Sequence, residues 1–160
     1  LWHEDKRIRC APAEVMADLA RADAELFRAH TLDGALMLIG RREVRTNNSW
    51  THNFQRLVKG KPQCVLFMHP DDVAERGLQD GQIVTLKSRV SEISLPLLVT
   101  DEVMPGVVSM PHGWGHGRKG VRLSIAQAHA GVSMNDVVDD KAMDKLSGNA
   151  VLSGVPVTVR

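Results

Sequence analysis

The spacing of apolar residues divides the chain into a helical first part and a strand-rich remainder. The first part carries four apolar residues at helical spacing: Val15, Leu19, Ala22 and Leu26. This spacing predicts one amphipathic helix from Pro12 to His30, which the Thr31–Gly34 turn would end. We therefore expect residues 1–35 to be a connecting or docking segment and residues 36–160 to be a separate domain.

From residue 36 onward, short runs rich in Val, Ile and Leu are separated by Gly, Pro or Asp, which is typical of strands. The predicted strands are Leu36–Ile39, Val65–Met68, Ile83–Ser88, Ile93–Val99, Val107–Met110 and Val155–Val159. The third and fourth are close enough to form a hairpin. Pro70–Arg76 predicts a short helix. Arg118–Asn135 shows no periodicity and is expected to be a long surface loop. Many short strands with few short helices favour a mainly β fold, a closed or nearly closed barrel.

Length, composition and charge exclude several classes of protein. A chain of 160 residues with 43% apolar residues can bury the core of one globular domain. Its net charge is +1, and no basic block indicates nucleic-acid binding. Its apolar runs are too short for this segment to insert into a membrane. No signal peptide is recognisable, and Leu1 suggests a piece of a longer polypeptide.

The two cysteines, Cys10 and Cys64, lie far apart and outside any CxxC pattern. They form neither a disulfide framework nor a zinc or iron–sulfur signature. Cys64 opens an apolar run, so we expect it to be a small buried hydrophobic residue. This cysteine usage favours a reducing compartment, and we expect a cytoplasmic location.

Arg41–Asn53 is a strongly polar segment that follows the first predicted strand. It holds arginines, whose guanidinium groups suit phosphate oxygens, and Asn, Ser and Thr side chains, which suit the edges of a heterocycle. A polar loop at the end of a strand is a common way to build a ligand site on a rigid scaffold. The alternative is an ordinary surface loop.

Two further segments carry candidate chemistry. In Met110–Gly117, His112 and His116 have the i, i+4 spacing that binds metal on a helix, but the glycines disfavour a helix and no third ligand is evident. A ring-edge contact to a heterocycle or a structural turn is favoured there. Asn135 suits either a turn cap or an amide that pairs with a heterocycle. Asp71 and Asp72 suit a helix start better than a catalytic pair.

Four segments, in this order and at similar spacing, resemble the C-terminal cofactor-binding domain of the molybdopterin oxidoreductases, closest to formate dehydrogenases and nitrate reductases. They are Gly40–Arg41 with Thr46–Asn53, His69–Pro70 with Asp80–Gly81, Pro111–His116, and Asn135 with Asp144 and Ser147–Gly148. The resemblance implies a double-psi β-barrel. It also implies binding of molybdopterin guanine dinucleotide, two copies around molybdenum or tungsten.

The resemblance also implies roles for individual residues. Three arginines are candidates for phosphate or pterin contacts: Arg41, Arg42 and Arg45. Candidates for hydrogen bonds to the pterin or diphosphate are Thr46, Asn47, Asn48, Ser49 and His52. A second approach to the cofactor would be lined by His112, Trp114, Gly115 and His116, and Asn135 would pair with a pterin or guanine edge.

The chain also departs from the family. Family members hold their metal through a residue of another domain, and many carry an iron–sulfur cluster near their N-terminus; neither Cys10 nor Cys64 fits these roles. Both sites must then lie outside this chain, which would have no turnover alone. Its partners would be the remaining domains of the enzyme, with an electron-transfer subunit as a further candidate. Asp136-Val137-Val138 replaces the usual Leu-Thr, which puts the late-loop contacts in question.

Two other functions stay open. The same barrel type serves as a non-catalytic binding module in some ATPase machines, or the chain could be a freestanding subunit, with residues 41–53 as a protein interface. Only Trp50 and Phe54 supply aromatic side chains there, which disfavours an interface. A small metal-dependent hydrolase using His112 and His116 lacks a third ligand and a general base.

Overall fold

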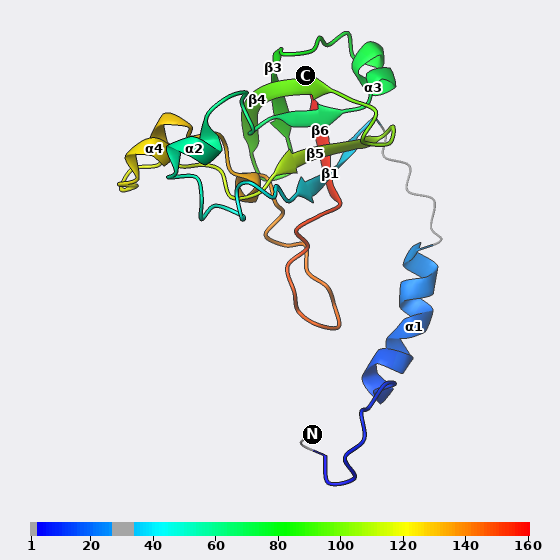
Figure 1. The fold of residues 1–160 in the computed structure, drawn as a ribbon. Helices are drawn as coiled ribbons and strands as arrows, with labels where there is room; N and C mark the ends of the chain where they lie inside the picture. Colours follow the sequence, from blue (N-terminus) through cyan, green and yellow to red (C-terminus); the bar gives the residue numbers. More distant parts are fainter. Residues whose placement is uncertain (1–2, 27–33) are drawn as a thin grey trace. The chain divides into compact units, whose positions relative to one another are not determined.

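The computed structural model describes residues 3–26 and 34–160, which fall into two compact units. The smaller unit contains the described residues up to Leu26 together with Met143–Asn149; the larger contains 34–142 and Ala150–Arg160. Figure 1 shows both. The predicted boundary between residues 35 and 36 stays a prediction.

The smaller unit is built on α1 (Ala13–Leu26), so a helix is confirmed within the predicted range. Residues 27–30 of that range, and most of the turn predicted to end it, lie outside the described residues. Arg21 stabilises the helix surface, since it donates to Asp18 and to Glu25 one turn away on either side. Within this unit, Lys145 lies 3.7 Å from Glu25.

The larger unit is a closed barrel with the strand order β1-β5-β2-β4-β3-β6. The strands are β1 (Leu36–Arg41), β2 (Leu66–Met68), β3 (Ile83–Lys87), β4 (Glu92–Val99), β5 (Val107–Pro111) and β6 (Val155–Val159). Strands β1 and β5 pair in parallel, as do β2 and β4, while the other neighbours are antiparallel. The predicted mainly β fold, the closed barrel and the β3–β4 hairpin are confirmed.

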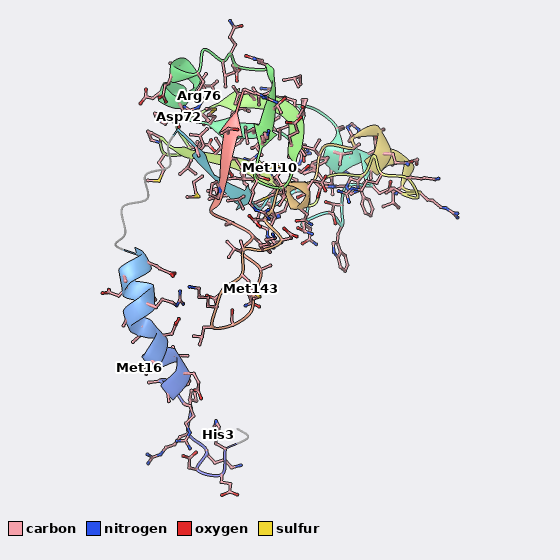
Figure 2. All side chains as sticks on the ribbon, turned by 180° about the vertical axis from the view of Figure 1, so that it is seen from behind. His3, Met16, Asp72, Arg76, Met110 and Met143 are labelled. Atoms are coloured by element: carbon pink, nitrogen blue, oxygen red, sulfur yellow. The ribbon has the colours of Figure 1, made fainter. Side chains whose placement is uncertain are left out.

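The barrel closes because alternate residues of each strand are apolar and point inward. In β3 the pattern leaves Val84 and Leu86 fully buried, and in β1 it buries Leu36 and Leu38. Met110 of β5, labelled in Figure 2, also has no exposed surface. Each such side chain contributes roughly 1.5–3 kcal/mol of transfer free energy. Within residues 3–26 and 34–160, no helix is both long and apolar enough to cross a membrane.

The short helix α3 (Pro70–Glu75) shows why two acidic residues stand at its start. The His69 side chain accepts a hydrogen bond from the backbone N–H of Asp71. Asp72 is buried and accepts a 2.7 Å hydrogen bond from the N–H of Gly106, in the turn before β5. Arg76, the residue that follows α3 (Figure 2), donates to the Asp72 carbonyl. Both acidic residues therefore stand in the first turn of the helix, as the sequence indicates, and the Asp72 carboxylate ties this turn to Gly106.

Three predictions about local structure were wrong or incomplete. Gly40 does not end the first strand; it pairs with Met110 inside β1. The helix α2 (Gln55–Val58) was not predicted. The stretch 118–135 is not an unstructured loop, since it contains α4 (Ser124–Ala128) and begins the 3-10 helix η1 (Met134–Asp136).

The cap of α4 explains why the sequence did not reveal this helix. Its own N-terminal residue, Leu123, makes no side-chain cap. Asn53 of the distant loop supplies the cap, because its Oδ1 accepts from the N–H groups of Ile125 and Ala126 at 3.1 and 3.2 Å. The helix therefore depends on a residue more than seventy positions earlier in the chain.

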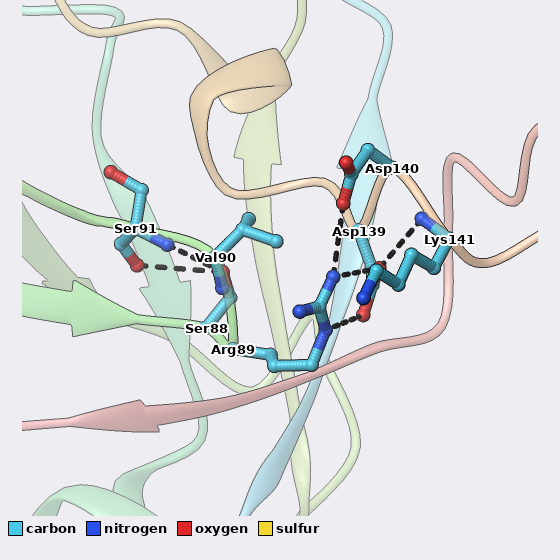
Figure 3. A network of polar contacts seen from close by, with 7 residues as sticks. All are labelled: Ser88, Arg89, Val90, Ser91, Asp139, Asp140 and Lys141. Carbon is cyan, nitrogen blue, oxygen red and sulfur yellow. Dashed lines mark hydrogen bonds and ion pairs between the residues drawn. The ribbon is translucent and has the colours of Figure 1, made fainter.

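The segment after η1 is held against the β3–β4 hairpin by Arg89 (Figure 3). Its guanidinium donates to both carboxylate oxygens of Asp139 at 2.6 Å and to Asp140 at 2.9 Å. The bonds from Arg89 are the main reason that the pKa of Asp139 lies below its usual value. The hairpin turn itself is closed by a bond from Ser88 N–H to the Ser91 carbonyl.

Candidate cofactor-binding site

The topology brings two candidate segments to one edge of the barrel. Strands β1 and β5 are parallel neighbours, and Arg41 is paired with Pro111 where both end. The chain segments that leave these strands, residues 42–53 and 112–116, therefore start side by side. A bond from the His112 N–H to the Arg41 carbonyl, at 3.0 Å, continues the pairing beyond the strands.

The segment 42–53 folds into successive turns. The Thr51 N–H donates to the Thr46 carbonyl, and the His52 N–H donates to the Ser49 carbonyl. Thr46 is 2% exposed, and its hydroxyl donates to the Glu43 carbonyl. Asn47 and Asn48 adopt left-handed backbone conformations at the exposed tip, with φ of 41° and 63°. Asparagine tolerates this conformation better than most residues.

His52, Trp114 and His116 form an aromatic cluster between the two segments, in which His52 and Trp114 are buried and His116 is half-buried. His52 is 1% exposed and stacks on Trp114, with ring centroids 3.9 Å apart and planes at 28°. Its Nδ1 lies 2.7 Å from Nε2 of His116, whose ring stands edge-on to it. One of these two nitrogens must donate and the other accept, so the contact requires an unprotonated acceptor.

Burial keeps the imidazoles of this site neutral. It lowers the pKa of His52 to about 4, with a further lowering by His116; a Gly113 backbone group acts in the opposite direction. Burial also lowers the pKa of His116 and of His112, and Arg42 adds to the effect on His112. At neutral pH the His52–His116 hydrogen bond is therefore between two neutral rings.

Glycines allow the segments to approach one another closely. A Cβ on Gly113 would lie 2.3 Å from the Asn48 carbonyl oxygen, and one on Gly40 would lie 2.0 Å from Nε2 of His112. Gly115 similarly passes Ser133, with a built Cβ 2.8 Å from the Ser133 side chain. This contact brings in a third segment, because Ser133 immediately precedes η1, where Asn135 is exposed.

The three candidate arginines are used differently. Arg41 is held in place by contacts within the protein. It donates to Glu43 at 2.6 Å and to the Ser109 carbonyl at 3.1 Å. Its guanidinium lies 3.5 Å from the centre of the Phe67 ring. Arg42 is exposed, and its bond to Asn48 is 3.4 Å long. Arg45 is exposed as well and makes a 3.4 Å bond to the Arg56 carbonyl.

Residues 36–156 match the protein family described as the Molydopterin dinucleotide binding domain. The chain belongs to this family. The predicted resemblance is thus confirmed, and with it the prediction that the chain is a molybdopterin dinucleotide-binding domain.

Several relatives of this domain are components of reductases. The chain is 28% identical over 131 residues to a subunit of the tetrathionate reductase of Salmonella typhimurium, a match that covers 71% of this chain and 13% of that protein. It is 27% identical over 119 residues to the molybdopterin-containing subunit of the arsenate respiratory reductase of Chrysiogenes arsenatis, covering 71% and 14%. The chain therefore spans about one seventh of the length of these relatives.

The fold has a counterpart among solved structures. Acetylene hydratase from Pelobacter acetylenicus superposes with a TM-score of 0.67 at 20% identity, over 90% of this chain and 19% of that protein. At this identity the likeness establishes the shared fold.

The residues present fit a cofactor with a flat heterocycle and phosphates. Asn47, Asn48 and Ser49 offer amide and hydroxyl groups at the tip of the loop. Two buried polar atoms, Nε2 of His52 and Nε1 of Trp114, have no hydrogen-bond partner, a costly arrangement that is common at functional sites. Among the described residues, no group of three His, Cys, Asp or Glu side chains is arranged to hold a metal ion.

The sequence alone missed residues that build the site. Glu43 and Ser109 fix Arg41, and Asn53 links the loop to α4. Glu43 could have been found from its position two residues after Arg41, but the partners of Arg41 and Asn53 depend on tertiary structure. Cys64 is buried, as predicted, and its sulfur accepts a 3.4 Å bond from the Val132 N–H.

Proposed function

We propose that this domain closes over two copies of molybdopterin guanine dinucleotide bound around molybdenum or tungsten in an oxidoreductase. The observation that carries the proposal is the convergence of residues 42–53, 112–116 and 133–135 at one barrel edge, joined by glycine contacts that leave no room for a side chain. A rigid rim of this kind can hold a large flat ligand in one orientation.

Each part of the rim has a distinct proposed role. Asn47, Asn48 and Ser49 pair with the edges of a pterin or guanine ring, and Arg42 binds the diphosphate as a charged donor. Asn135, on η1, meets the cofactor from the other side. The buried residues Thr46, His52 and Trp114 hold the loop in shape for these contacts.

When bound, the metal and its pterins supply the electron transfer, whereas this chain binds and orients them. We propose that the metal ligand and any iron–sulfur cluster belong to other domains of the same enzyme, and that an electron-transfer subunit completes it. Apolar side chains exposed on and beside the loop support contact with such domains: Val44 is 98%, Trp50 81% and Phe54 60% exposed.

The proposal is tested on the complete natural protein that contains this chain. Its molybdenum, tungsten and iron are measured by mass spectrometry, and its released pterin is identified by chromatography. We expect one molybdenum or tungsten ion and two guanine dinucleotides per protein. A protein without bound pterin, made in a host that synthesises the cofactor, would show that the proposal is wrong.

A further inference from the structure

The hydrogen bond between His52 and His116 has a direction, and this direction decides which group each ring offers to its surroundings. Nδ1 of His52 lies 2.7 Å from Nε2 of His116. A neutral imidazole carries one N–H group and one bare nitrogen, so the ring that donates at this contact has a bare second nitrogen. The ring that accepts carries its N–H on the second nitrogen. The two possible directions therefore leave different groups unpaired inside the protein.

The first direction, with His116 as the donor, leaves two unpaired N–H groups. The proton of His52 is then on Nε2, which is buried and has no hydrogen-bond partner among the described residues. Nε1 of Trp114, which can only donate, is buried and unpaired there as well. The two rings stack with centroids 3.9 Å apart, so this direction places two unpaired donors in neighbouring rings.

The second direction, with His52 as the donor, leaves fewer unpaired N–H groups. His52 then donates from Nδ1, and its Nε2 is a bare acceptor. Only the N–H of Trp114 stays unpaired in the two stacked rings. An orphaned buried N–H group is rarer in native proteins than an unpaired acceptor, because its desolvation is not compensated. The unpaired atoms therefore favour His52 as the donor.

This direction also fixes the group that His116 presents outside the cluster. Because Nε2 of His116 accepts, the proton of this ring is on Nδ1. Within residues 3–26 and 34–160, this Nδ1 has no hydrogen-bond partner, and it is not one of the buried unpaired atoms. It is therefore accessible to a ligand. The backbone N–H of His116 donates to the Ala130 carbonyl at 3.0 Å, which holds the end of segment 112–116 in place.

We propose that His52 is a positioning residue that holds His116 as an Nδ1–H donor for a carbonyl oxygen or ring nitrogen of the bound pterin. His52 is 1% exposed, so it acts through His116 and not by touching the ligand. The identity of the ligand rests on the proposed function, whereas the direction of the hydrogen bond does not. A donor fixed before binding saves the cost of orienting the ring when the ligand arrives.

Neutron diffraction shows the direction of the bond and needs no substitution. The crystal is grown at neutral pH from complete protein expressed in D2O, so that both rings carry deuterium. We expect deuterium on Nδ1 of His52 and on Nδ1 of His116. Deuterium on Nε2 of His52 would make this ring the acceptor and would overturn the inference.

Two substitutions separate hydrogen bonding from packing. His52→Asn keeps a side-chain N–H near the position of Nδ1 but loses the stacked ring, whereas His52→Phe keeps the ring and cannot donate. We measure the rate at which the loaded complete protein releases its pterin. His52→Phe should release it roughly two- to tenfold faster than the parent, the effect of one hydrogen bond, and His52→Asn should stay closer to the parent.

A role in packing alone predicts the reverse order of the two variants, and that order, or equal rates for His52→Phe and the parent, would overturn the inference. His129→Asn changes a half-buried histidine outside the cluster and is the control, with an expected rate equal to the parent's. A complete protein without pterin would instead contradict the proposed function, and the deuterium on His52 would still decide the direction of the bond.

Discussion

The barrel interior and the cluster around His52 both contain buried side chains but differ in chemistry. Leu38, Leu66 and Met110 have no exposed surface and no polar side-chain atoms that need a hydrogen bond. His52 and Trp114 are also buried, yet each keeps one ring nitrogen without a partner. Burying an unpaired polar group costs about 1–3 kcal/mol.

The difference indicates that the buried apolar side chains of the barrel stabilise the folded state, whereas the unpaired nitrogens of the cluster lower its stability. A strained or unpaired site persists only where the surrounding structure over-determines it. Here the parallel β1–β5 pair fixes the starts of both segments, so the cluster keeps its geometry despite its unpaired atoms. Mutations in the barrel should therefore reduce stability, while mutations in the cluster should mainly change ligand binding.

The largest loss of stability is expected from a substitution in the barrel interior. Leu38→Ala removes a side chain with no exposed surface and leaves a cavity. The free energy of unfolding should fall by about 2–5 kcal/mol, measured by chemical denaturation. Leu98→Ala, on the outer face of the barrel, is the control and should cost much less. Equal losses for the two variants would contradict the inward alternation described above.

The pH dependence of the protein's stability should come from the cluster around His52. The pKa of His52 is lowered to about 4 in the folded protein, against an unfolded value near 6.5. Between these values the unfolded chain binds the proton and the folded one does not, so stability is full above pH 6.5 and falls as pH drops toward 4. The contribution is at most about 3 kcal/mol.

Denaturation midpoints of the parent and of His52→Gln, compared from pH 7.5 to 4, measure this contribution. The variant should lose the part of the pH dependence that His52 causes. His116 also faces His52 and its pKa is lowered as well, so some dependence should remain. His3→Gln, in an exposed position, is the control. A parent protein whose stability is flat across this range would contradict the prediction.

A smaller effect is expected from the glycine contact between the two segments. Gly113→Ala adds a Cβ 2.3 Å from the Asn48 carbonyl oxygen, at a φ of 86°. Gly120→Ala is a matched control, because it has a φ of 96° but nothing within 4 Å. The backbone conformation costs both variants about 1–2 kcal/mol. Only Gly113→Ala should also lower the pterin content of the complete protein, and equal pterin loss would show that the close contact is unimportant.

The sequence predicted the barrel better than it predicted the site. The apolar alternation of the strands is a local signal, so five of the strand predictions matched closely, and β1 was wrong only in ending at Ile39. That strand continues through Gly40 because Gly40 pairs with Met110 of β5, about seventy residues later in the chain, and only glycine fits there since the His112 ring occupies the place of a Cβ. Local periodicity carries no such information.

The prediction of the candidate site from the sequence was limited for the same reason. Residue types placed Asn47, Asn48 and Ser49 on a polar loop, and the structure leaves them accessible or partly so. The sequence could not separate Arg41, which the protein holds in place, from Arg42 and Arg45, which stay exposed. Charge and spacing are alike for all three, and only the tertiary partners Ser109 and Phe67 distinguish them.

The smallest effect is expected at Arg89, which joins the hairpin to the segment after η1 (Figure 3). Arg89 is about half exposed, and exposed ion pairs add little to global stability. Arg89→Gln should therefore leave the unfolding midpoint nearly unchanged. It should increase proteolytic cleavage within 137–142, because that segment loses its bidentate anchor to Asp139. Arg122→Gln, an exposed residue, is the control. If the variant were cleaved no faster than the control, the segment would be held by the packing of Val137 in the barrel core and not by its charges.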